Sequence, residues 1–155
     1  MCSSDLRTKH EQWYLGDTYN MSIGQGDDLV TPLEMATFVA SIARNQVSTK
    51  PTLIHNPNAA RQESESIGLT AEQRAALLQG MEGATTVGTA KTLSARNAPY
   101  YVPGLRIAGK TGTAQKTETI DGKKGTTNYA WFVGFAPAEN PQIAVAVLVE
   151  PESLD

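Results

Sequence analysis

The chain has 155 residues, of which 40% are hydrophobic and 19% are charged, a composition that indicates a folded protein and excludes intrinsic disorder. Thirteen basic residues against 16 acidic ones give a net charge of −3 without a dense basic cluster, so we expect no nucleic-acid partner. The single cysteine and the two distant histidines exclude a disulfide scaffold and a zinc module, and we expect no cofactor and no metal.

The first 12 residues are polar and have no apolar period, which predicts an unstructured lead-in over residues 1–12. Residues 1–6, Met-Cys-Ser-Ser-Asp-Leu, equal the translation of a common sequencing-adapter sequence, and we interpret them as an artefact. No apolar run approaches the ~20 residues that cross a bilayer, and no charged-then-apolar leader opens the chain. We therefore expect no membrane anchor and no export signal in this chain.

The next segment, residues 13–30, carries glycines and aspartates that are typical of turns, so its pattern predicts a loop. A helix is predicted to begin at Thr31-Pro32, because a threonine cap precedes a proline at the first helical position. Glu34 in the first turn and apolar residues at three- and four-residue steps up to Ala43 support it. One face of this helix is expected to be buried.

A connector and a second helix follow. Residues 45–69 are rich in proline and polar side chains, which predicts a connector with a short extended piece at 52–54. Thr70 and Gln73 form a capping-box signature, and apolar side chains continue the helical pattern from there to Gly83. The second helix is therefore predicted to begin after Thr70.

The last third of the chain predicts three strands, over residues 105–115, 129–136 and 143–149. The link at 137–141 is short enough for a hairpin, so the second and third strands are expected to be antiparallel neighbours. The third is apolar on both faces, which predicts a central strand or one covered by a helix on each side, and we expect its covering helix to be missing from this chain. Between the first two strands we expect a polar loop with a turn at Asp121-Gly122 and a solvated rim formed by Lys116, Lys123 and Lys124.

One segment, Gly109-Lys110-Thr111-Gly112-Thr113, combines a cation, two hydroxyls and two glycines on a predicted strand. Residues two apart on a strand face the same way, so Thr111 and Thr113 can present both hydroxyls to one carboxylate while Lys110 supplies the charge. Gly112 leaves room for a ligand backbone. The pattern resembles the K-T-G-T strand beside the active site of penicillin-recognising serine enzymes.

Two other interpretations of the same segment exist. Residues 104–111 also fit G-x-x-x-x-G-K-[ST], the nucleotide-binding loop. The stretch from Leu105 to Ala108 favours a strand, however, and no helical pattern follows Thr111, so the sequence disfavours a phosphate-binding loop. An ordinary solvated strand is the remaining alternative, because so short a string also arises by chance.

Eight segments outside and around this string carry a wider resemblance: Trp13-Tyr14, Gly16-Asp17-Thr18, Ile23–Gly26, Thr31–Ala36, Gly80-Met81, Val87–Ala90, Ala108–Gln115 and Ala130–Pro137. On these segments the sequence resembles the C-terminal part of the transpeptidase domain of class B penicillin-binding proteins over about residues 13–150. The Gly-Asp-Thr and Gly-Gln-Gly pieces resemble the elongation type, penicillin-binding protein 2, more than the division type. The implied fold is α+β, the C-terminal part of a penicillin-binding/β-lactamase-like transpeptidase fold in which an antiparallel sheet packs with helices.

The resemblance implies an extracytoplasmic peptidoglycan D,D-transpeptidase that cross-links stem peptides through a serine acyl-enzyme, is acylated by β-lactams and works with the elongation machinery. It implies that Lys110 bridges to the serine of a second motif and that Thr111 and Thr113 hold the substrate carboxylate. It also implies that the Thr113 amide forms half of the oxyanion hole. Lys110 and Thr113 are thus the predicted catalytic residues, and Thr111, Gly112 and Thr113 the predicted substrate-binding residues.

The sequence also departs from the family pattern. No serine is followed three positions later by lysine, and no S-x-N element occurs, so the expected nucleophile and general base are not encoded. We therefore expect residues 13–155 to be a partial transpeptidase domain, truncated at both ends and inactive alone. A fragment of a serine β-lactamase-like hydrolase and a non-catalytic penicillin-fold binding module are the alternatives.

Overall fold

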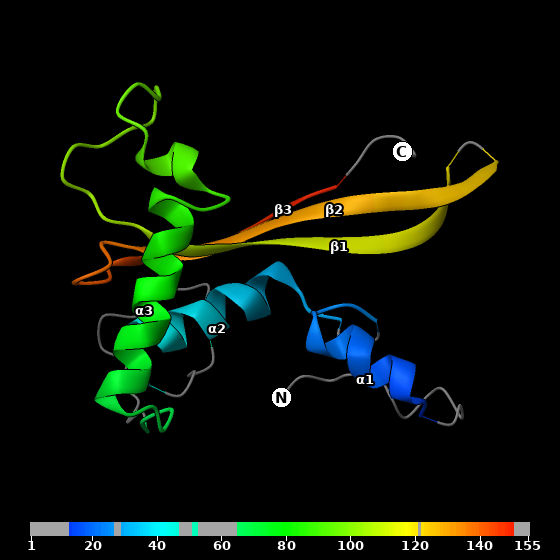
Figure 1. The fold of residues 1–155 in the computed structure, drawn as a ribbon, viewed down its shortest axis with the longest axis horizontal. Coiled ribbons are helices and arrows are strands. Elements are labelled where there is room, and N and C mark those ends of the chain that lie inside the picture. Colours follow the sequence, from blue (N-terminus) through cyan, green and yellow to red (C-terminus); the bar gives the residue numbers. More distant parts are fainter. Residues whose placement is uncertain (1–12, 27–28, 47–50, 53–64, 121, 151–155) are drawn as a thin grey trace.

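The computed structural model describes residues 13–26, 29–46, 51–52, 65–120 and 122–150, so the predicted lead-in and the suspected artefact lie outside it. The three strands form one antiparallel sheet in the order β1-β2-β3 (Figure 1). This α+β arrangement and the β2–β3 hairpin confirm the sequence-based predictions. The elements are the helices α1 (Leu15–Ser22), α2 (Pro32–Arg44) and α3 (Ala71–Thr86), the 3-10 helix η1 (Lys91–Ser94), and the strands β1 (Ala108–Ile120), β2 (Lys123–Ala136) and β3 (Ile143–Val149).

The two predicted helices, α2 and α3, begin at the predicted capping boxes. In α2 the Glu34 amide donates to the Thr31 hydroxyl at 3.2 Å, and the Thr31 amide donates to the Glu34 carboxylate at 2.8 Å. The Thr31 amide, and after it the Thr31 hydroxyl, lower the pKa of Glu34 below its ordinary value. Thr70 and Gln73 make the same pair of bonds at 3.2 and 2.9 Å, and α3 then continues past its predicted end to Thr86. Within the described ranges, no helix combines the length and apolar character that spanning a bilayer requires.

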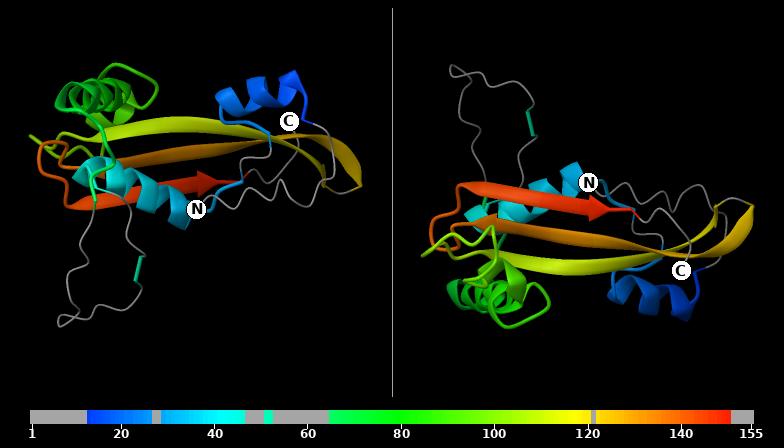
Figure 2. Two further views of the ribbon diagram at one scale, coloured as in Figure 1. Left: turned by 90° about the horizontal axis from the view of Figure 1, so that it is seen from below. Right: turned by 90° about the horizontal axis from the view of Figure 1, so that it is seen from above.

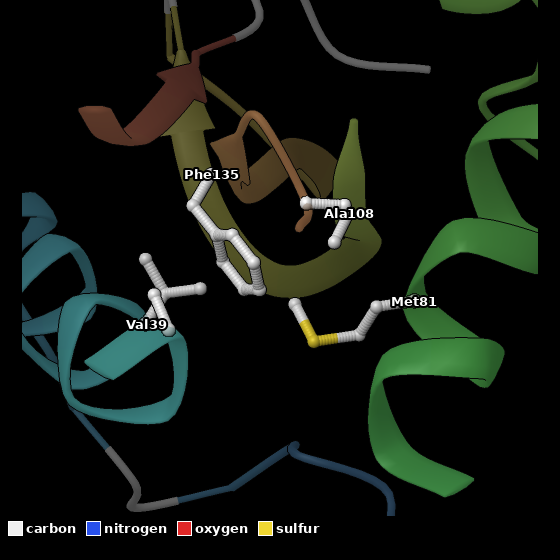
Figure 3. Packing of buried hydrophobic residues seen from close by; sticks show 6 residues of the cluster. Val39, Met81, Ala108 and Phe135 are labelled. Carbon is white, nitrogen blue, oxygen red and sulfur yellow. The ribbon is translucent and has the colours of Figure 1, made fainter. Parts of the chain in front are cut away.

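The hydrophobic core joins both helices to one end of the sheet. Val39 from α2, Met81 from α3, Ala108 from β1 and Phe135 from β2 are all buried and belong to one cluster (Figure 3). α2 lies across one face of β2 and β3, whereas α3 and α1 lie on the side of β1, at opposite ends of the sheet (Figure 2). Because Ala108 is fully buried, the start of β1 is the best anchored part of that strand.

The loop predicted over residues 13–30 is wrong in its first half, where α1 forms. None of the α1 residues is buried, so the helix leaves no apolar period in the sequence. Local bonds specify it instead: the Tyr14 amide donates to the Asp17 carboxylate at 2.8 Å, and the Trp13 indole N–H donates to the Thr18 hydroxyl at 2.9 Å. The Gly-Asp-Thr piece, which was interpreted as turn chemistry, therefore lies in the first turn of a helix.

The polar loop predicted between the first two strands is wrong except at its turn, where Gly122 lies between β1 and β2 with a φ of 77°. β1 starts three residues later than predicted and runs to Ile120, while β2 starts at Lys123, so both strands extend through the polar segment. Lys116 lies in β1 with its ammonium 6.0 Å from the centroid of the Tyr129 ring, and Lys124 lies in β2. These polar strands pair by backbone bonds and are largely exposed, so they show no alternation of apolar residues.

β3 is an edge strand of the described sheet and not a central one, and its open apolar face agrees with the expectation that one covering helix is missing. α2 packs against it, but side chains on one face remain open to solvent, with exposed fractions from 40% for Val145 to 66% for Ile143. An apolar run without alternation therefore does not indicate whether other elements of the same chain cover both faces of the strand.

The exposed β3 face gives a testable prediction for the isolated chain. We expect the purified 155-residue chain to bind a hydrophobic dye and to self-associate, because an edge strand carries exposed valines and isoleucine at residues 143, 145, 147 and 149. The double variant Val145→Lys/Val147→Lys should weaken both effects, whereas Thr126→Lys, at an exposed polar position of β2, should not. A monomer by sedimentation that binds no dye would contradict the prediction.

Candidate active site

The beginning of β1 is held in place by α3 and by the β2–β3 turn. The buried Thr85 hydroxyl of α3 donates to the Ile107 carbonyl at 2.6 Å, and the Arg106 guanidinium forms an ion pair with Glu82. The Ala138 amide donates to the Arg106 carbonyl at 2.9 Å. These bonds fix the backbone directly before Ala108, so the segment Lys110 to Thr113 leaves the core in a defined direction.

The segment Lys110 to Thr113 pairs with β2 on one side only. Thr111 lies opposite Phe132, Gly112 opposite Trp131 and Thr113 opposite Ala130. A Cβ on Gly112 would lie 3.3 Å from the Cβ of Trp131, so glycine relieves crowding across the pair. No strand among the described residues pairs with the other edge of β1, which we call the free edge.

The side chains of the two threonines differ in their contacts. The Thr111 hydroxyl lies 2.7 Å from the hydroxyl of Thr89, which comes from the turn after α3. The turn requires glycine at position 88, because a Cβ there would lie 2.8 Å from the Ala84 Cα. The Thr113 side chain is exposed, and its hydroxyl makes no hydrogen bond among the described residues. It is therefore open to an incoming acceptor.

One contact shows which backbone N–H and C=O groups of β1 point to the free edge. The Thr113 carbonyl accepts a bond at 2.9 Å from the side chain of Gln25, which belongs to no strand, so this carbonyl points away from β2. In an antiparallel strand the N–H and C=O of one residue point to the same side, and residues two apart repeat that direction. The N–H groups of Thr113 and Thr111 therefore point to the free edge as well. The Lys110 ammonium donates to the Thr111 carbonyl on that edge.

The arrangement is suited to binding and polarising an anionic carbonyl compound. An exposed ammonium, an open hydroxyl and a backbone N–H lie within four consecutive residues, and all three are groups that can donate hydrogen bonds. A carboxylate matches the ammonium and the hydroxyl, because hydrogen bonds between charged partners are stronger than neutral ones. A backbone N–H held in a strand is the kind of donor that stabilises a developing oxyanion.

The structure brings the four predicted site residues together on one strand segment, and it adds two that the sequence analysis did not single out, Thr89 and Gln25. Both lie in segments quoted for the family resemblance, Val87–Ala90 and Ile23–Gly26, and that was their only signal in the sequence. The structure excludes the nucleotide-binding loop, because Gly109 to Thr111 lie inside a strand that continues to Ile120.

Comparison with known proteins decides the family. Residues 4–153 match the family model described as the penicillin binding protein transpeptidase domain. The chain belongs to the penicillin-binding transpeptidase family. The expected fold and family are therefore confirmed, and the Lys110 to Thr113 segment is the K-T-G-T string of a penicillin-binding transpeptidase sequence.

This penicillin-binding transpeptidase chain is similar to several named proteins and solved structures. It is 36% identical over 132 residues to the peptidoglycan D,D-transpeptidase PbpA of Mycobacterium tuberculosis, covering 83% of this chain and 26% of PbpA. The imipenem acyl-enzyme of penicillin-binding protein A from M. tuberculosis superposes with a TM-score of 0.62 at 33% identity, covering 84% of this chain and 28% of that one. Penicillin-binding protein 2 from Helicobacter pylori superposes with a TM-score of 0.66 at 29% identity, covering 94% of this chain and 25% of that one. The chain thus spans about a quarter of the length of these relatives.

The Thr89–Thr111 contact gives a prediction for a penicillin-binding transpeptidase that contains this chain. Thr89→Val removes the hydroxyl that orients Thr111, and one neutral hydrogen bond corresponds to about 0.5–1.5 kcal/mol. We expect the second-order rate of acylation by a β-lactam to fall by roughly 2- to 10-fold. Thr92→Val, at an exposed position of η1, should leave that rate unchanged. Equal rates for both variants would show that Thr89 does not orient Thr111.

Proposed function

We propose that this chain is the substrate-binding part of a peptidoglycan D,D-transpeptidase whose free β1 edge receives the acyl donor. The observation that carries the proposal is the presence of the Lys110 ammonium, the Thr113 hydroxyl and the Thr113 N–H on one segment of β1, whose outer edge pairs with no other strand in the part of the chain that the structure describes. The names of the relatives support it, since PbpA of M. tuberculosis is a peptidoglycan D,D-transpeptidase.

In the proposed reaction, a serine hydroxyl from outside this chain attacks the carbonyl carbon of the donor's terminal peptide bond. An O–C bond forms, the C–N bond breaks, the serine proton passes to a base and the departing amine takes up a proton. The carbonyl oxygen carries the negative charge in the tetrahedral intermediate, where the Thr113 N–H donates to it. Attack by the amine of a second stem peptide then releases the serine and completes the cross-link.

The donor's terminal carboxylate fixes the register of this reaction. We propose that the carboxylate accepts hydrogen bonds from the hydroxyls of Thr113 and Thr111, the second of which is oriented by Thr89. The positive charge of the Lys110 ammonium attracts the carboxylate to this position. A β-lactam carries a carboxylate next to a strained amide, so the same contacts would direct its acylation. The imipenem acyl-enzyme of the M. tuberculosis relative supports β-lactams as ligands of this edge.

The cellular setting follows from the proposed substrate. Peptidoglycan stem peptides lie outside the cytoplasmic membrane, so we propose that the whole protein acts on the extracytoplasmic face. The likeness to penicillin-binding protein 2 supports a partnership with the elongation machinery as the finer proposal. A β-lactamase-like hydrolase and a non-catalytic binding module are less well supported, because the named relatives include D,D-transpeptidases.

A fluorescent penicillin tests the proposed function. The full-length protein that contains this chain should be labelled covalently on a serine of an S-x-x-K element, and the label should resist denaturation. The 155-residue chain alone should not be labelled, because its sequence contains no such element. Absence of label on the folded full-length protein, or label on a serine or threonine of this chain, would overturn the proposal.

A further inference from the structure

The side chain of Gln25 bridges the loop after α1 to the free edge of β1. Its Nε2 donates to the Thr113 carbonyl at 2.9 Å, and its Oε1 accepts from the Gln115 amide at 3.2 Å. The two partners lie 88 and 90 positions further along the chain. The partners also fix the orientation of the carboxamide, because the reversed orientation would set donor against donor and acceptor against acceptor.

The backbone of the same loop is fixed as well. The Gln25 amide donates to the Asn20 carbonyl of α1 at 2.9 Å. The glycines on either side, Gly24 and Gly26, have φ values of 75° and 90°, in the left-handed region that favours glycine. The half-buried Gln25 side chain is therefore directed at β1 by a specified loop conformation rather than by a chance surface contact.

The carboxamide replaces the missing neighbour strand directly after Thr113. It offers one donor and one acceptor to the two outward backbone groups, as the N–H and C=O of one residue in an adjacent parallel strand would. The Thr113 carbonyl belongs to the peptide plane that follows the Thr113 N–H, and Gly112 precedes it. Without an outer partner, the peptide planes on both sides of Thr113 would be held only by their pairing with β2, next to a glycine that allows a wider range of backbone conformations.

We propose that Gln25 is a positioning residue for acylation, which holds the Thr113 carbonyl and thereby keeps the Thr113 N–H directed at the oxyanion. The proposal rests on the proposed function, because that function assigns the Thr113 N–H to the oxyanion. In this assignment Gln25 acts through its bonds to the Thr113 carbonyl and the Gln115 amide, and not through a bond to the reacting atoms. Its effect should therefore appear in the acylation step rather than in the binding of the β-lactam before acylation.

Stopped-flow acylation of the full-length protein by a chromogenic β-lactam separates the two steps, because the acylation rate constant k2 and the dissociation constant Ks follow from saturation. Gln25→Ala removes both bonds. Gln25→Glu keeps the shape and an acceptor for the Gln115 amide but has no N–H for the Thr113 carbonyl. Gln142→Glu is the matched control, since the Gln142 side chain bonds the Asn140 carbonyl in the β2–β3 turn.

We expect k2 to fall by about 3- to 10-fold in both Gln25 variants, with Ks changed by less than about 2-fold and no change in Gln142→Glu. Hydrogen exchange at the Gln115 amide should accelerate in Gln25→Ala and stay slow in Gln25→Glu. A wild-type k2 in Gln25→Glu, an effect on Ks alone, or unchanged Gln115 exchange in Gln25→Ala would overturn the inference. Lack of acylation in the wild-type protein would instead overturn the proposed function.

Discussion

Replacing Lys110 by alanine in the full-length protein is expected to lower the second-order rate of acylation by a β-lactam by about 100- to 1,000-fold. The variant removes the cation of the free edge and its bond to the Thr111 carbonyl. Removal of a single donor that stabilises transition-state charge typically costs about 2.7–4 kcal/mol in an acyl-transfer enzyme, which corresponds to this range. The substrate carboxylate also loses its counter-charge, so the variant should bind the β-lactam less tightly before acylation.

The matched control for this experiment is Lys124→Ala, because Lys124 is an exposed lysine of the same hairpin and lies near its far end. It removes the same charge from the protein without touching the free edge beside Thr111. The rate should stay within about 2-fold of the wild-type value, as for surface charges in general. Comparable losses in Lys110→Ala and Lys124→Ala would mean that the rate follows net charge and not the site.

Thr113→Val is expected to produce the second-largest loss, about 10- to 100-fold in the same acylation rate. Valine keeps the β-branched shape and strand preference of threonine but removes the one hydroxyl of the segment that has no partner among the described residues. A hydrogen bond to a charged group contributes about 1.5–3 kcal/mol, which corresponds to roughly one to two decades in rate. The Thr113 amide remains, so oxyanion stabilisation should persist.

The control variant is Thr119→Val, which makes the identical chemical change at an exposed position near the far end of β1. It should leave both the acylation rate and the melting temperature close to the wild-type values. Indistinguishable rates for Thr113→Val and Thr119→Val would remove Thr113 from the site. The K-T-G-T assignment would then be wrong.

The parts of the fold that were predictable from the sequence carry local signals. The capping boxes at Thr31 and Thr70 fixed the starts of α2 and α3, and their neighbours in sequence supply the bonds. α1 buries no residue, and the outer halves of β1 and β2 are polar, so neither gives a hydrophobic period. These elements depend on capping and on cross-strand backbone bonds, which single-sequence patterns do not record.

The candidate site likewise contains residues that were predictable from the sequence and residues that were not. Lys110, Thr111, Gly112 and Thr113 are adjacent in sequence, which was sufficient to group them, and the alternation of a strand placed Thr111 and Thr113 on one face. Thr89 and Gln25 reach the same segment from 22 and 88 positions away, and their contacts exist only after α1 and α3 have taken their places beside β1. Their quoted sequence motifs marked the segments but did not indicate which side chain contacts the strand.

The most direct test of the carboxylate-binding edge compares a β-lactam acid with its methyl ester on wild-type and Thr113→Val full-length protein. If the Thr113 hydroxyl binds the carboxylate, the substitution should slow acylation by the acid about 10- to 100-fold and acylation by the ester by less than about 3-fold. The measurement is the ratio of the four second-order rate constants. Equal losses for the acid and the ester would contradict the proposed role of the free β1 edge.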